Sequence, residues 1–114
     1  MDKPIPHADT RCHLVLTTLP SREAALTIAR TLVEERRAAC VQLVDGLHSI
    51  YHWEGRIDES AECQLVAKAP AAVSAALVDR LRALHPYDVP EILTLDATAS
   101  EAYARWLAAE CAPR

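Results

Sequence analysis

The stretch from residue 39 to residue 68 constrains the fold more than any other part of the chain. It begins as an apolar run, Ala39–Val44, and then alternates with a strand period up to a turn. Asp45-Gly46 predicts a bulge within this strand, and Glu54-Gly55 predicts a tight turn, because glycine adopts positive φ without a steric cost. The residues Cys63–Ala67 return as a second strand. The sequence therefore predicts one long β-hairpin over residues 39–68.

A strand and a helix are predicted before the hairpin. Cys12–Thr18 is a short apolar run, which is typical of a strand buried on both faces. Ser21 is a good helix N-cap, and Glu23 follows it in the first turn, next to the positive end of the helix. Apolar residues then recur at helical spacing, which predicts a helix that continues to about Arg37.

A second helix, a final strand and a third helix are predicted after the hairpin. Pro70 suits the first turn of a helix, which ends at His85 because Pro86 disfavours helical geometry in the residue before it. Glu91–Leu95 is predicted as the final strand, and Ser100 caps the last helix. The residues expected on one face of that helix are Tyr103, Trp106 and Leu107. The order β-α-β-β-α-β predicts an α+β, ferredoxin-like sandwich with an extra C-terminal helix and a long hairpin between its second and third strands.

The length of 114 residues is that of a single domain. Residues 1–11 are polar, so we expect a loose tail there and one domain over residues 12–112. Sixteen Asp and Glu residues outnumber twelve Lys and Arg, which gives a net charge of −4 and excludes the basic surface by which proteins bind nucleic acid. No apolar run reaches the roughly 18 residues that a membrane-spanning helix needs, so no membrane partner is expected.

Four cysteines are spread along the chain without a CxxC pair: Cys12, Cys40, Cys63 and Cys111. Dispersed thiols among apolar neighbours are typical of buried, reduced cysteines, so no intramolecular disulfide is expected. No export signal precedes the first predicted strand. These two features predict a cytoplasmic protein.

Among the five histidines, His85 has the context best suited to a site. His48 and His52 share one side of a predicted strand but lie about 13 Å apart at roughly 3.3 Å per residue, so no single ion joins them within one chain. His85 lies where a helix ends and an X-Pro turn begins, so its ring can be positioned and partly exposed. With a cysteine thiolate it would form a nitrogen–sulfur pair suited to copper or zinc, and contact with the free carbonyls of the helix end is the alternative.

The segment that follows His85 is rigid and polar. Two prolines fix its backbone and hold Tyr87 and Glu91 in defined places, which is typical of loops that line sites. Trp53 lies at the predicted hairpin tip, where an exposed aromatic is more typical of an interface contact than of a cofactor site.

Five segments of the chain resemble, in the same order, those of one family. They are Thr17–Ser21, Glu34–Cys40, Ser49–Gly55, Leu84–Ile92 and Tyr103–Leu107. Together they are similar to the divalent-cation tolerance proteins of the CutA type, and the resemblance spans about residues 12–110.

The resemblance implies a ferredoxin-like protomer in a tight homotrimer, similar in architecture to the PII signalling proteins. It also implies a link to tolerance of copper and other divalent metals, and Cys40 and His85 match the family positions for such a ligand pair. A copper-binding member carries a further cysteine where this chain has Thr17 and a second histidine where it has Leu84, so fewer ligands are present here. The cofactor that the resemblance implies is copper or another divalent cation, and no organic cofactor is expected.

The residues bear on several classes of function. A metal-tolerance protein would use the cysteine–histidine pair. A PII-like regulatory module would bind a small ligand in clefts between subunits, for which Trp53, Lys68, Tyr87 and Glu91 are candidates. An enzyme such as an acylphosphatase needs an asparagine, which this chain lacks, and an RNA-binding module needs stacking aromatics on its central strands. The sequence therefore predicts a non-enzymatic protein whose main partner is a second and third copy of itself.

Overall fold

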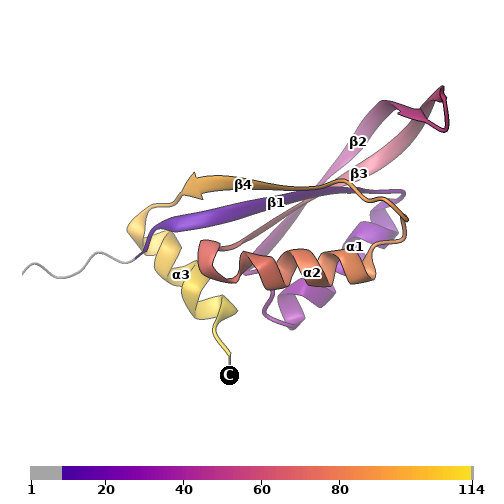
Figure 1. The fold of residues 1–114 in the computed structure, drawn as a ribbon. Helices are drawn as coiled ribbons and strands as arrows, with labels where there is room; N and C mark the ends of the chain where they lie inside the picture. The colour runs from indigo at the N-terminus through magenta and orange to yellow at the C-terminus, as the bar shows by residue number, and fades with distance from the viewer. Residues whose placement is uncertain (1–8, 114) are drawn as a thin grey trace, which may run out of the picture.

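The computed structural model describes residues 9–113 and has the predicted ferredoxin-like topology (Figure 1). Its elements are β1 (Arg11–Leu19), α1 (Arg22–Glu34), β2 (Cys40–Trp53), β3 (Arg56–Pro70), a short 3₁₀ turn (Ala71–Val73), α2 (Ser74–Leu84), β4 (Ile92–Thr98) and α3 (Glu101–Cys111). The four strands form one antiparallel sheet in the order β2-β3-β1-β4. The prediction of an α+β sandwich with an extra C-terminal helix and a long β2–β3 hairpin is confirmed.

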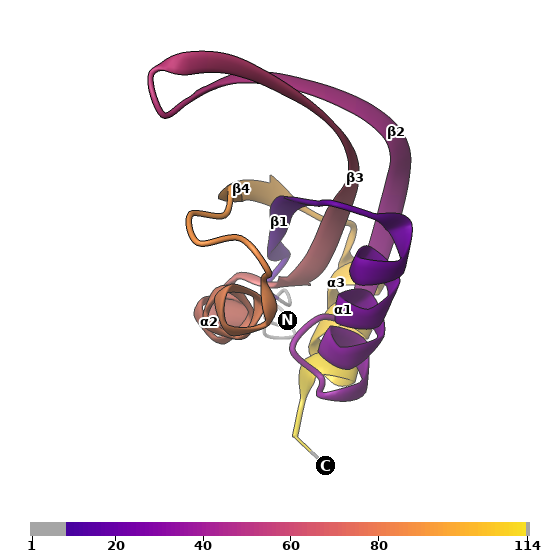
Figure 2. The ribbon, with the colours of Figure 1, turned by 90° about the vertical axis from the view of Figure 1, so that its right-hand side faces the viewer.

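The hydrophobic core lies between the sheet and the two crossover helices, which cover the same face of the sheet (Figure 2). Alternate residues of β1 and β3 point into it, and Val15, Leu65 and Ala67 have no exposed surface. Leu32 of α1 and Leu77 of α2 are equally buried opposite them. Every second side chain of these strands therefore packs against the apolar faces of the two helices in a single core layer.

The β2–β3 hairpin extends far beyond the rest of the sheet (Figure 1). Pairing between β1 and β3 stops at Leu19 and Cys63, so residues 47–62 pair only with each other. We call residues 47–62 the hairpin arm. The predicted bulge is present between Val44 and Leu47, where Gly46 adopts a φ of +79°. The arm makes the protomer elongated, with extents of 66 × 25 × 22 Å.

Helix α1 ends three residues before the predicted end at Arg37. Arg36 adopts a φ of +60°, in the left-handed region that stops a helix. This turn sends the Arg36 guanidinium to the C-terminus of α3, where it donates to the carbonyl of Glu110 at 2.9 Å. A tertiary contact therefore sets the helix end. The second helix is also shorter than predicted, since Pro70 closes β3 and a 3₁₀ turn precedes Ser74.

The aromatic residues of α3 do not enter the core with Leu107. Tyr103 and Trp106 are 36% and 42% exposed and stack on one another with ring centroids 5.5 Å apart. The helix instead packs through Ala104 and Leu107 at the end of the sheet where β1 begins and β4 ends (Figure 1). Strand β4 begins one residue later than predicted, at Ile92, and ends three residues later than predicted, at Thr98.

All four cysteines are free thiols, and two of them are buried as expected. Cys12 and Cys63 are 5% and 3% exposed, whereas Cys40 and Cys111 are only partly buried. Cys40 and Cys111 are therefore the more exposed of the four cysteines.

The predicted tail over residues 1–11 lies mostly outside the described residues. Within the described part, Asp9 accepts two hydrogen bonds from the Arg11 side chain, and Arg11 already belongs to β1. Among residues 9–113, no helix is long and apolar enough to cross a membrane.

Strand β3 places fully buried side chains at the centre of the core, among them Leu65. We expect Leu65→Ala to lower the free energy of unfolding by about 2–5 kcal/mol, because the truncation removes a fully buried side chain and leaves a cavity. Val33→Ala, at a position 42% exposed on α1, is the control and should change it by less than about 1 kcal/mol. Urea unfolding at one fixed protein concentration measures both, and equal effects would contradict this assignment of the core.

Candidate functional site

A buried polar cluster surrounds His85 at the end of α2. The residue is 9% exposed, and both ring nitrogens have partners. Nδ1 accepts from the backbone N–H of Tyr87 at 3.2 Å, so the ring hydrogen belongs on Nε2. From there it faces the Thr18 carbonyl at 3.0 Å and the Thr17 hydroxyl at 2.9 Å. His85 is thus held as one neutral tautomer that joins α2 to β1.

Local sequence explains how His85 reaches this position. The residue has extended backbone angles, φ −71° and ψ 135°, as expected before Pro86. The chain therefore leaves α2 abruptly and turns the ring back over the end of β1, where Thr17 is completely buried. The expectation that this ring is positioned by the X-Pro turn is confirmed, but the ring is buried rather than partly exposed.

Burial sets the protonation of His85. Desolvation lowers its pKa below the ordinary value of 6.5, although the Thr18 carbonyl and the nearby Glu62 carboxylate act in the opposite direction. A charged ring would carry a second hydrogen on Nδ1, directly against the Tyr87 N–H. The neutral form is therefore the one that fits.

Tyr87 connects this cluster to the root of the hairpin arm. Its hydroxyl donates to a carboxylate oxygen of Glu62 at 2.8 Å, and its ring lies 5.0 Å from that of His85. Burial, and then the hydrogen bond to Glu62, raise the pKa of Tyr87 well above its ordinary value. The 85–91 loop is therefore tied to both β1 and β3.

Cys40 lies at another end of the sheet, at the start of β2 and opposite Lys68. Its neighbour is Tyr103 of α3, whose pKa is raised by burial and by interaction with the Cys40 thiol. Lys68 is three residues along β3 from Leu65, the partner of Thr17, which corresponds to about 10 Å at roughly 3.3 Å per residue. Strands β2 and β1 lie on either side of β3, so two strand spacings, about 10 Å, also separate Cys40 from Thr17 across the sheet. One chain therefore does not bring Cys40 and His85 together.

The four candidate cleft residues are also spread over the chain. Trp53 lies at the tip of the hairpin arm, and Lys68 lies at its base. Trp53 pairs with Arg56 of β3, and Lys68 lies twelve residues further along that strand, which corresponds to about 40 Å at roughly 3.3 Å per residue. Glu91 is exposed next to β4, and only Tyr87 joins the His85 cluster. A cleft that uses all four would have to form between protomers.

Sequence reasoning missed the partners of His85. Thr17, Thr18 and Glu62 lie far from it in the chain and carry no motif that pairs them with it. The predicted topology contained one usable signal, because α2 returns antiparallel to β3 and therefore parallel to β1, which brings its C-terminus near the end of that strand.

A second histidine cluster has the composition of a catalytic triad. His13 Nδ1 lies 2.5 Å from the Ser74 hydroxyl, and His13 Nε2 lies 2.7 Å from the Asp96 carboxylate. Ser74 is only 6% exposed and also donates to the Ala71 carbonyl, whereas the Asp96 side chain is almost fully solvated. A buried hydroxyl with an outward carboxylate suits a tie between β1, β4 and α2 better than a nucleophile.

The described residues contain no cluster of three or more His, Cys, Asp or Glu side chains that could hold a metal ion within one chain. His48 and His52 are both exposed on the arm, and His48 pairs with Glu59 at 2.7 Å.

The fold, with its additional C-terminal helix and long hairpin, defines a class of small ferredoxin-like proteins. Residues 13–110 match the model of the CutA1 divalent ion tolerance protein family. The divalent-cation tolerance protein CutA of Thermus thermophilus is 50% identical over 95 residues, which cover 82% of this chain and 92% of that protein. A crystal structure of CutA1 from Ehrlichia chaffeensis superimposes with a TM-score of 0.87 at 29% identity, over 93% of this chain and all of the other. The chain belongs to the CutA1 divalent ion tolerance family.

Another relative bears on the compartment. The chloroplastic CutA protein of Arabidopsis thaliana is 39% identical over 95 residues, which cover 82% of this chain and 52% of that protein. This chain therefore spans about half of that relative. Since a chloroplast protein has the same domain, the cytoplasmic location of this chain stays a prediction.

The lowered pKa of His85 predicts how the free energy of unfolding depends on pH. Because the folded state holds the ring below its ordinary pKa of 6.5, the unfolded chain takes up a proton first as the pH falls. We expect the free energy of unfolding to decrease as the pH falls below 6.5 and to level off below the folded-state pKa. His85→Gln should flatten this slope, whereas His52→Gln on the exposed arm should leave it intact. Urea unfolding from pH 4.5 to 8 measures it, and an unchanged slope in His85→Gln would contradict the assignment.

Proposed function

We propose that the protein is a non-enzymatic divalent-cation tolerance protein that acts as a homotrimer. Membership of the CutA1 family supports the tolerance function. The observation that carries the assembly is the apolar character of the sheet face that the helices leave uncovered.

This uncovered face is built from the alternate residues of three neighbouring strands. Leu93, Leu16 and Val66 form one cross-strand row, and Leu95 and Leu14 lie in the next. Leu93 and Leu95 are 51% and 47% exposed in the protomer. We call these five residues the open face. A contiguous apolar surface of this kind is typical of an interface between subunits.

The hairpin arm gives a second argument for assembly. A two-stranded ribbon without a third strand is only marginally stable in water. Ile50 and Ile57 near its tip are nevertheless 65% and 68% exposed, and they share one side of the ribbon. A partner that covers the arm would bury both side chains and also pair or shield its free edges.

Light scattering during size-exclusion chromatography tests the assembly. We expect a mass of about three times 12.5 kDa for the wild type and a monomer for Leu95→Glu, which places a charge on the open face. Val33→Glu is the matched control, because Val33 is similarly exposed but lies on α1. A wild-type monomer at micromolar concentration, or equal behaviour of the two variants, would refute the proposal.

We further propose that the protein binds copper through Cys40, with His85 as a second ligand from another protomer. Cys40 is one of the two more exposed cysteines, and thiolate with imidazole is a ligand pair suited to copper. His85 must give up one of its internal hydrogen bonds to bind a metal ion, and this loss weakens the binding. Because binding displaces a thiol proton, the affinity should rise with pH.

A copper titration that follows the thiolate-to-copper charge-transfer band tests this site. Cys40→Ser should abolish the band, and His85→Ala should weaken the affinity. Cys111→Ser is the matched control, since Cys111 is the other of the two more exposed cysteines and should leave the band unchanged. The exposed His48 and His52 can bind copper without a charge-transfer band, so the band and not the total copper is decisive. If both Cys40→Ser and His85→Ala titrate as the wild type does, the proposed copper site is wrong.

A PII-like regulatory module is the alternative function. The hydrogen bond from Tyr87 to Glu62 favours it, because this bond fixes the 85–91 loop at the root of the arm, next to the proposed subunit boundary. A small ligand bound there would contact Tyr87 and residues of a neighbouring protomer. Calorimetric titrations with nucleotides and with metals, run in parallel, distinguish the two functions.

A further inference from the structure

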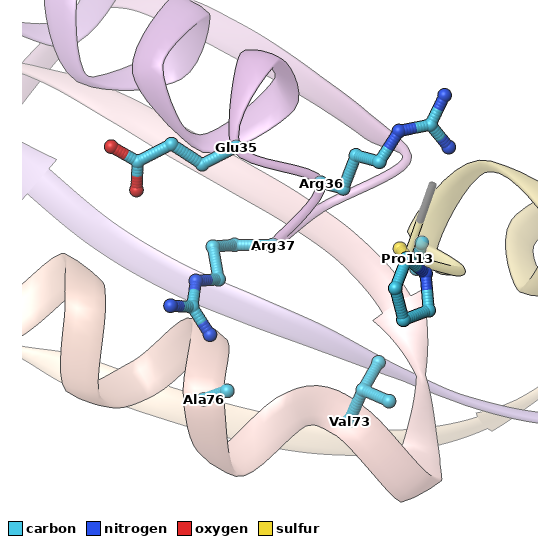
Figure 3. Close-up of a pocket in the computed structure, with 7 residues that line it drawn as sticks. Glu35, Arg36, Arg37, Val73, Ala76 and Pro113 are labelled. Atoms are coloured by element: carbon cyan, nitrogen blue, oxygen red, sulfur yellow. The ribbon is translucent and has the colours of Figure 1, made fainter.

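A hollow outside the regions above lies on the helix side of the protein. It lies where the C-terminus of α1, the start of α2 and the C-terminus of α3 meet (Figure 3). Its volume is about 420 Å³, within the range of roughly 300–1,000 Å³ that small-molecule sites occupy. The wall is largely apolar and includes Val73, Ala76, Cys111 and Pro113. Burial raises the pKa of the Cys111 thiol, so this side chain is uncharged and compatible with such a wall.

Two consecutive arginines border this hollow and have different roles. Arg36 donates to three carbonyls at the end of α3. Arg37 lies on the side of α2, and Figure 3 shows its guanidinium above Ala76 while that of Arg36 points away. The Arg37 backbone N–H donates to the Leu32 carbonyl, but its guanidinium makes no hydrogen bond or ion pair with another side chain among residues 9–113. The left-handed backbone of Arg36 separates the two side chains.

The Glu35 carboxylate only partly balances the charge of Arg37. Both of its oxygens accept from Arg80, at 2.7 and 2.8 Å, and its pKa is lowered mainly by Arg80 and to a smaller extent by Arg37. The hollow therefore has a positive charge without a hydrogen-bonded partner above an apolar wall. This combination is complementary to a molecule with one anionic and one apolar end.

We propose that this hollow binds a small amphipathic anion, a monocarboxylate with an aliphatic or small aromatic group. The carboxylate would pair with the guanidinium of Arg37, which presents parallel N–H donors that match carboxylate geometry. The apolar group would cover Val73, Ala76 and Pro113 and displace water from them.

The position of the hollow makes it accessible in the proposed homotrimer. The open face and the hollow lie on opposite sides of the core, because α1 and α2 cover the other face of the sheet (Figure 2). The site therefore does not depend on the proposed function, and assembly does not close it.

Octanoate is a suitable probe for the uniformly ¹⁵N-labelled full chain. Titration followed by two-dimensional NMR should show saturable shifts at the amides of Arg37, Val73 and Ala76, with one site per chain. Arg37→Gln should weaken the binding at least about tenfold, because it removes the charge that pairs with the carboxylate. Arg30→Gln, at an exposed and unpaired arginine on α1, is the matched control and should bind as the wild type does.

Two further measurements keep the test decisive. Ala76→Leu fills the hollow and should also abolish binding, while octanol, which lacks the charge, should bind far more weakly than octanoate. The proposal is wrong if Arg37→Gln retains wild-type affinity, if the wild type shows no saturable shifts, or if the shifts concentrate at Leu93 and Leu95 of the open face.

Discussion

The structure depends on a sheet that is apolar on both faces but covered by helices on only one. Val15, Leu65 and Ala67 bury the first face completely against α1 and α2. Their neighbours along the strands, such as Leu14, Leu16 and Val66, are also apolar but only partly covered. Successive side chains of a strand point to opposite faces of the sheet, so a strand with apolar residues at successive positions must be packed against other structure on both faces. The protomer supplies one cover, and this imbalance is the physical reason for expecting association.

The hairpin arm increases that imbalance. The bulge at Gly46 lies where the paired sheet ends, so the arm changes direction as it leaves the core. Bonds at its root limit the freedom of the arm: Tyr87 fixes Glu62 of β3, while Arg22 of α1 contacts Asp45. The arm is thus a projecting ribbon with a well-supported base, which is the geometry needed to reach another chain with little loss of conformational entropy.

The sequence predicted the elements well because hydrophobic periodicity reports directly on burial. It failed where a contact distant in sequence decided the outcome. Arg36 ends α1 in a left-handed turn whose side chain caps a helix more than 70 residues later. Trp106 pairs with Tyr103 at the surface, and the small Ala104 takes the buried position. For the candidate site, the X-Pro rule placed His85 correctly, but its buried contact with Thr17 followed only from tertiary packing.

The same packing separates three chemical regions in one small protein. The open face lies on the sheet, the Cys40 thiol lies at one end of it beside Tyr103, and the Arg37 charge lies among the helix ends. Two ligands influence one another only if binding of the first changes a contact that the second uses. Arg36 joins the end of α1 to α3 through the carbonyls next to the hollow. Coupling between an anion at Arg37 and events at Cys40 therefore has two physical routes: the buried residues Ala38 and Ala39, which connect the two positions along the chain, and α3, whose Tyr103 interacts with that thiol.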